Sequence, residues 1–219
     1  MPDTGYQIPD SAGVVIEFMF TQTHTQTIRY PVSGIWYPEY LYFYPLMNLL
    51  AQFKLITCFA FDVDGVLTNG SLLISPGGEW LRQMNIKDGY ALQLAIKKGY
   101  HVLILSGAKS DPVADRLLKL GISQIFQGIE DKAGQLKACM QSLNLEANKV
   151  LFMGDDIPDY GALQVVGLPC CPADAVIEIR NSSKYISPFA GGQGCVRDVI
   201  EKVLKLNGHW SLGTEISSF

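Results

Sequence analysis

Short apolar runs alternate with amphipathic stretches from Lys54 onward. The apolar runs have the length of buried strands and the stretches between them have helical spacing, so the pattern predicts an α/β fold with a mainly parallel sheet. The predicted strands cover residues 56–61, 101–105, 124–126, 150–153, 167–170 and, as an edge, 185–186. The predicted helices cover residues 89–98, 111–120, 132–143, 160–165, 173–180 and 195–206.

One interval breaks this alternation directly after the first predicted strand. Two short extended runs, residues 71–75 and 80–85, are joined by Pro76-Gly77-Gly78, which is turn chemistry. The interval therefore predicts a β-hairpin flap. Because ligands of open α/β sheets bind beyond the carboxyl ends of the strands, we expect the chemistry there.

Residues 1–52 are rich in Thr, Gln, Pro and Tyr and show no sustained periodicity. We interpret them as a separate, poorly specified segment, followed by one catalytic domain over residues 53–210 and a tail over residues 211–219. The aromatic stretch at residues 36–53 is too interrupted to span a bilayer, which needs roughly 20 mainly apolar residues. It is interpreted as an arm that packs on a surface or a partner, or else the native product begins at Met47.

The composition favours small-molecule chemistry. The 219 residues carry a formal charge of −4, and acidic and basic residues are interspersed. This distribution gives no electrostatic sign of binding to nucleic acid or to an anionic membrane. The five cysteines form neither a disulfide framework nor a zinc spacing. The apolar run at residues 12–20 lacks the basic flank of a secretory signal, so we expect a cytoplasmic protein.

Two acidic motifs follow apolar strands. Asp62 and Asp64 come after the first strand, where an extended chain would put both side chains on one face. Asp155, Asp156 and Asp159 come after the fourth. Each motif also has a plain structural interpretation, as a solvated turn and as a helix N-cap respectively. If the two strands are neighbours, however, Asp62, Asp64 and Asp155 converge and need a hard divalent cation such as Mg²⁺.

Two further features suit a phosphate group. Ser106 and Gly107 follow the second strand just before a helix, where a hydroxyl and backbone N–H groups can bind phosphate oxygens. Lys132 begins a later helix and could offset the charge of a phosphate. Taken alone, Ser106 is equally a capping residue, and a lone Lys is usually solvated.

In this order, the four motifs resemble those of the haloacid-dehalogenase (HAD) superfamily of phosphotransferases. The resemblance implies a Rossmann-like HAD fold. It implies that Asp62 attacks phosphorus to form an aspartyl phosphate, and that Asp64 protonates the leaving alcohol and then activates water. It also implies the binding residues, which are Asp62, the Asp64 carbonyl and Asp155 for Mg²⁺, Asp156 or Asp159 in support, and Ser106, Gly107 and Lys132 for the phosphoryl group.

No interval is long enough for a cap domain, which in this superfamily implies a homotetramer whose neighbouring subunit closes the site. Residues 85–90, 154–160 and 191–198 look like those of the 3-deoxy-D-manno-octulosonate (KDO) 8-phosphate phosphatases, and this resemblance runs from about residue 53 to residue 210. It implies a phosphorylated sugar acid as substrate and a role in making lipopolysaccharide precursors.

One position departs from that family. An Arg, or a Glu in related enzymes for nine-carbon acids, usually follows the Ser/Thr-Gly, whereas this chain has Ala108. Lys109 could supply the missing cation, and Arg197 could reach a neighbour's site from a Gly-rich turn. The alternatives are a phosphatase for a nine-carbon keto sugar acid phosphate or another phosphosugar, a non-catalytic HAD-like oligomerisation module, and a receiver domain.

Overall fold

The computed structural model describes residues 48–210. The chain divides into two units, Met1–Tyr44 and Pro45–Phe219, and all the described residues belong to the second. Met47, most of the aromatic stretch and the predicted tail lie outside the described residues, so the domain limits stay predictions.

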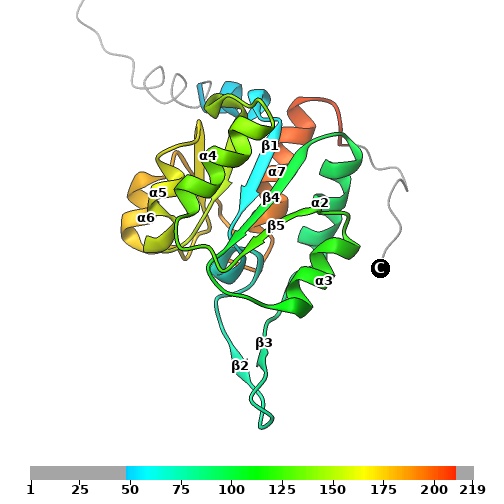
Figure 1. Ribbon diagram of the computed structural model, residues 1–219. Helices are drawn as coiled ribbons and strands as arrows, with labels where there is room; N and C mark the ends of the chain where they lie inside the picture. Colours follow the sequence, from blue (N-terminus) through cyan, green and yellow to red (C-terminus); the bar gives the residue numbers. More distant parts are fainter. Residues whose placement is uncertain (1–47, 211–219) are drawn as a thin grey trace, which may run out of the picture. The chain divides into compact units, whose positions relative to one another are not determined.

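Six strands form one parallel sheet (Figure 1). Their order is β5-β4-β1-β6-β7-β8, and β1 pairs with β4 on one side and β6 on the other. The bounds are β1 Cys58–Phe61, β4 His101–Ser106, β5 Gln124–Gln127, β6 Val150–Met153, β7 Leu168–Cys171 and β8 Tyr185–Ile186. The predicted parallel sheet is confirmed, and the segments that follow β1, β4 and β6 emerge side by side.

Helices cover both faces of this sheet (Figure 1). Side chains alternate between the faces along β1, so that Phe59 and Phe61 pack in one apolar core and Cys58 and Ala60 in the other. The first core is covered by α2 (Ile86–Lys97), α3 (Asp111–Lys119) and α7 (Cys195–Leu206), and the second by α4 (Lys132–Ser142), α5 (Tyr160–Leu163) and α6 (Ile177–Ser182). A further helix at residues 48–55 precedes β1.

Two predicted helix starts were wrong. The first helix begins at Ile86 and not at residue 89, because the Asn85 side chain accepts a hydrogen bond from Lys87 N at 2.9 Å and caps the helix there. The helix predicted from residue 173 begins at Ile177, because the preceding residues form a turn in which Ala175 N donates to Pro172 O.

The predicted flap is confirmed as a two-stranded antiparallel hairpin of β2 (Leu73–Ile74) and β3 (Trp80–Leu81). It follows η1 (Val63–Leu67), the single turn after β1, and projects beyond the carboxyl end of the sheet (Figure 1). Between residues 48 and 210, no helix has both the length and the apolar character needed to cross a membrane.

Candidate active site at the carboxyl end of the sheet

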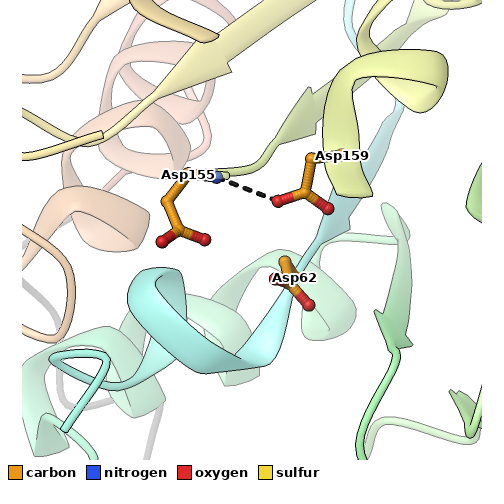
Figure 2. A group of neighbouring side chains, drawn as sticks. All are labelled: Asp62, Asp155 and Asp159. Carbon is orange, nitrogen blue, oxygen red and sulfur yellow. Dashed lines mark hydrogen bonds between the residues drawn. The ribbon is translucent and has the colours of Figure 1, made fainter. Parts of the chain in front are cut away.

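Three carboxylates meet where β1 and β6 end (Figure 2). Asp62 directly follows β1, and its backbone N–H donates to Met153 O in β6 at 3.1 Å, which ties the two strand ends together. Asp155 and Asp159 come from the loop after β6 and from η3 (Ile157–Asp159). Each of the three offers a carboxylate oxygen, and these oxygens lie within 4.8 Å of one another.

The loop after Asp62 is shaped to admit Asp155. Gly65 has φ +82°, and an added Cβ would overlap the Asp155 carboxylate, so this position needs glycine both for its backbone and for the space. Thr68 fixes the loop, because its Oγ1 accepts hydrogen bonds from the N–H groups of Gly65 and Gly70, both at 3.3 Å. This close approach depends on the tertiary fold and carries no signal in the sequence.

Lys132 is the cation of the cluster. Its Nζ lies 2.9 Å from Asp62 Oδ1 and 2.6 Å from Asp159 Oδ1, although the residue is only 6% exposed. Asp131 caps the start of α4 by accepting from Gly134 N at 2.9 Å, which places Lys132 in the first turn. Burial acts to lower the pKa of Lys132, but the charges of Asp62 and Asp159 outweigh it and raise the pKa, so the ammonium keeps its charge.

The cluster carries more negative charge than Lys132 can balance. Burial raises the pKa of Asp62, the charge of Asp159 raises it further, and Lys132 offsets only part of this rise. Burial and the neighbouring charges of Asp159 and Asp62 raise the pKa of Asp155 to about 7. Three oxygen donors with an excess of negative charge, and no His or Cys among them, fit a hard divalent cation such as Mg²⁺.

The two acids that the sequence proposed as metal support have different positions. Asp159 belongs to the carboxylate cluster, and its other oxygen accepts from Asp155 N at 3.0 Å. Asp156 instead caps η3, because its Oδ1 accepts from Ile157 N at 2.7 Å. The N-cap interpretation of this motif therefore describes Asp156, and Asp159 is the acid that faces Asp62.

Ser106 and Gly107 follow β4, the strand next to β1. Ser106 is 4% exposed, and its carbonyl accepts from Ile129 N at 3.1 Å, which fixes the turn. Since Ile104 pairs with Phe61 in the sheet register, Ser106 and Gly107 emerge beside Asp62. The structure thus brings together at one edge the acidic, hydroxyl and Lys motifs that are far apart in the sequence.

Asp64 does not join the carboxylate cluster. Both of its oxygens accept from one guanidinium, with Arg82 Nε to Oδ1 at 2.7 Å and Arg82 Nη2 to Oδ2 at 3.1 Å. Arg82 follows β3 at the base of the hairpin. The expected convergence of the Asp64 carboxylate with those of Asp62 and Asp155 is not seen, because Arg82 binds both of its oxygens. Sequence analysis also missed Arg82, since one Arg in a hairpin carries no signal.

The two residues proposed to read the sugar contact other groups of this chain. Lys109 is exposed, and its aliphatic stem packs against Gly128. The Arg197 guanidinium lies 5.1 Å from the ring centre of Trp210 and 5.8 Å from that of Tyr90, and its Nε donates to Glu201 at 3.0 Å.

The Gly-rich segment before α7 contacts the loop after Asp62 in its own chain. Gly192 N donates to Val66 O at 2.9 Å. An added Cβ at Gly191 would overlap the carbonyl of Gly65, so the two backbones are in direct contact. The sequence marked this segment as a turn, but its contact with the loop after Asp62 depends on the tertiary fold.

Known proteins are similar to this chain in sequence and in fold. The chain matches no protein-family model. It is similar to the KDO 8-phosphate phosphatase KdsC of Escherichia coli K12, with 32% identity over 161 residues, covering 74% of this chain and 86% of the relative.

Two solved structures extend this likeness. The KDO 8-phosphate phosphatase of Moraxella catarrhalis, in complex with a magnesium ion, a phosphate ion and KDO, has 33% identity and a TM-score of 0.70, and the match covers 73% of this chain and 91% of that one. A Legionella pneumophila protein described as a hydrolase of HAD superfamily subfamily III A has 30% identity and a TM-score of 0.75. The match covers 77% of this chain and 93% of that one. The chain therefore spans most of the length of the relatives that it matches.

Proposed function

Because the chain belongs to the KDO 8-phosphate phosphatase family of the HAD superfamily, we propose that it hydrolyses KDO 8-phosphate to KDO and inorganic phosphate. The observation that carries this proposal is the cluster of Asp62, Asp155 and Asp159 around Lys132 at the carboxyl end of the sheet. This reaction would place the protein in lipopolysaccharide precursor synthesis in the cytoplasm. The five free, buried cysteines support a reducing compartment.

Asp62 is the nucleophile of the proposed reaction. One of its carboxylate oxygens attacks phosphorus, the bond between phosphorus and the sugar oxygen breaks, and Asp64 gives a proton to that oxygen. The product on the chain is an aspartyl phosphate. Asp64 then takes a proton from water, and the attack of this water on phosphorus releases phosphate and restores Asp62.

The transferring phosphoryl group needs donors and positive charge. Lys132 lies beside Asp62, and Ser106 with the N–H of Gly107 emerges next to it, so these groups are proposed to hold the phosphoryl oxygens. The proposed Mg²⁺ ligands are Asp62, Asp155 and the Asp64 carbonyl, with Asp159 or Asp156 in support. When bound, the ion supplies the charge that allows an anionic phosphate to approach these acids.

A substrate panel tests the reaction. The full chain with Mg²⁺ is expected to release phosphate from KDO 8-phosphate with a higher kcat/KM than from a nine-carbon keto sugar acid phosphate or from glucose 6-phosphate, and a chelator should stop release. No release from KDO 8-phosphate would contradict the proposal. If Lys109 reads the sugar carboxylate, Lys109→Ala should raise KM for both acids and leave KM for glucose 6-phosphate unchanged, with the exposed Lys137→Ala as control.

We propose further that the protein is a homotetramer in which a neighbouring subunit closes the site. The support is the hairpin, whose Leu73, Ile74 and Trp80 are 67%, 65% and 62% exposed, since an apolar hairpin of this kind is costly to leave in water. Light scattering is expected to give four copies for the wild type and fewer for Ile74→Asp, with Glu79→Gln at the hairpin turn as the matched control. A monomeric wild type would contradict this assembly.

A further inference from the structure

The pairing of Asp64 with Arg82 joins the predicted acid–base residue to the flap. The two parallel hydrogen bonds, at 2.7 and 3.1 Å, use both carboxylate oxygens and one edge of the guanidinium. This two-point geometry fixes the plane of the carboxylate, which a single contact cannot do.

The two partners differ in exposure. The Arg82 side chain is 6% exposed, whereas the Asp64 side chain is 36% exposed. Arg82 therefore lies behind Asp64, and Asp64 keeps an open side toward solvent. Of the two side chains, the carboxylate is thus the more open to a substrate, so we expect an effect of Arg82 on the reaction to pass through Asp64.

The base of the hairpin contacts the loop after Asp62 at a second point. Met84 forms a β-bridge with Thr68, the residue whose Oγ1 also holds Gly65. Arg82 and Met84 thus connect the chain that leaves β3 to the start and the end of the loop after Asp62. A displacement of the hairpin would move the Asp64 carboxylate with it.

We propose that Arg82 is a positioning residue, which orients Asp64 toward the leaving group. The orientation of Asp64 then depends on the position of the hairpin. This inference rests on the proposed function, in which Asp64 protonates the sugar oxygen and activates water. It assigns to the hairpin a part in the acid–base steps in addition to any contact with a neighbouring subunit. Lys at position 82 would keep the charge but would lose the two-point contact.

A double-mutant cycle tests this assignment. The full chain with Mg²⁺ is assayed on KDO 8-phosphate and on p-nitrophenyl phosphate, whose leaving group needs no proton. Arg82→Ala should lower kcat on KDO 8-phosphate about 100-fold with little change in KM, because misplacement of a reacting group by about 1 Å costs this much. Arg82→Lys should recover part of the loss, and Gln83→Ala, an exposed neighbour, should match the wild type.

The decisive comparison is made in the Asp64→Asn background on p-nitrophenyl phosphate. If Arg82 acts through Asp64, Arg82→Ala should change the remaining rate less than about twofold there, because coupled residues are not additive. The inference would be overturned if Arg82→Ala lowered the rate on p-nitrophenyl phosphate equally in the wild-type and Asp64→Asn backgrounds. It would also be overturned if Arg82→Ala lowered no rate in the wild-type background.

Two further outcomes complete the test. If Arg82→Ala does not fold, as judged by thermal unfolding, Arg82→Lys carries the same cycle. A wild type that hydrolyses neither substrate overturns the proposed function and this inference with it, whereas an active wild type with additive losses overturns the inference alone.

Discussion

Asp198 and the cluster of three acids at the end of the sheet differ in how far their charges are satisfied. Asp198 in α7 accepts hydrogen bonds from Tyr185 Oη at 2.7 Å and Ser187 Oγ at 3.0 Å, and it pairs with Lys202. In the cluster of Asp62, Asp155 and Asp159, Lys132 pairs with Asp62 and Asp159. A carboxylate whose hydrogen-bond donors and cation are all present stabilises the fold. A cluster of carboxylates with too little positive charge favours the binding of a cation.

This difference has an energetic cost at the cluster. Burial and the neighbouring acids raise the pKa of Asp62 and Asp155, which means that their charged forms are disfavoured in the folded protein. Natural sites commonly give up stability in this way for function. Replacing an acid of the cluster should therefore affect turnover more than folding, and replacing Asp198 should do the reverse.

The largest effect is expected for Asp62→Asn. The amide cannot act as the nucleophile, so turnover should fall on the order of 10⁴-fold or more. The melting temperature should stay the same or rise, because one of three repelling charges is removed. Phosphate release and thermal unfolding measure the two effects. A variant within tenfold of wild-type turnover would show that another residue attacks phosphorus.

Lys132→Met tests how far one cation stabilises the cluster. At pH 8 without Mg²⁺, the free energy of unfolding should fall by about 3 kcal/mol, because removing one partner leaves buried charges uncompensated. Urea unfolding measures this loss, and the exposed Lys137→Met on the same helix is the matched control. Adding Asp159→Asn should restore part of the loss. If it restores nothing, the cost lies in lost packing and not in charge.

Asp88 is an intermediate case that sharpens the comparison through pH. It is 2% exposed, Oδ1 accepts from Arg197 N at 2.7 Å, and Oδ2 has no hydrogen-bond partner. Burial raises its pKa from 3.8 to about 6, and the backbone N–H groups of Arg197 and Gly194 offset part of this. The folded state thus binds this proton more tightly than the unfolded chain, and the stability due to Asp88 falls as pH rises between these values.

Asp88→Asn should therefore become more stable relative to the wild type as pH rises. Near pH 4 the amide and the neutral acid are alike, and the two proteins should differ little. Near pH 7 the variant should be more stable by up to about 3 kcal/mol, the equivalent of a shift of about two pKa units. Urea unfolding at each pH measures the difference, in which other titrating acids cancel. A constant difference would mean that Asp88 does not titrate in this range.

Much of the fold could be predicted because its central strands β4, β1, β6 and β7 are buried on both faces. β6 matched its predicted bounds and β1, β4 and β5 lay within two residues, since an apolar run of this length has few alternatives. The helix starts at Ile86 and Ile177 were missed. They depend on one capping side chain and one turn, which apolar spacing does not report.

The candidate site could be predicted where a single chemical requirement calls for a particular residue type. Asp62, Asp155 and Lys132 follow from the chemistry of a phosphate and a divalent cation at the ends of neighbouring strands. The direction of the Asp64 side chain was not predictable. It depends on the turn η1 and on Arg82, which lies 18 residues away and meets Asp64 only in the folded chain.

Asp198→Ala gives the smallest effect and inverts the first prediction. The side chain is 7% exposed, and its loss leaves Tyr185 Oη and Ser187 Oγ without their acceptor, which should cost about 2 kcal/mol. Turnover per folded molecule should stay within about twofold of the wild type, because surface and structural sites away from the reacting atoms seldom alter the chemistry. Urea unfolding and phosphate release on the same sample measure both. A large loss of turnover at full folding would mean that α7 transmits its position to the loop after Asp62 through the contact of Gly192 with Val66. Asp198 and the carboxylate cluster would then not be independent.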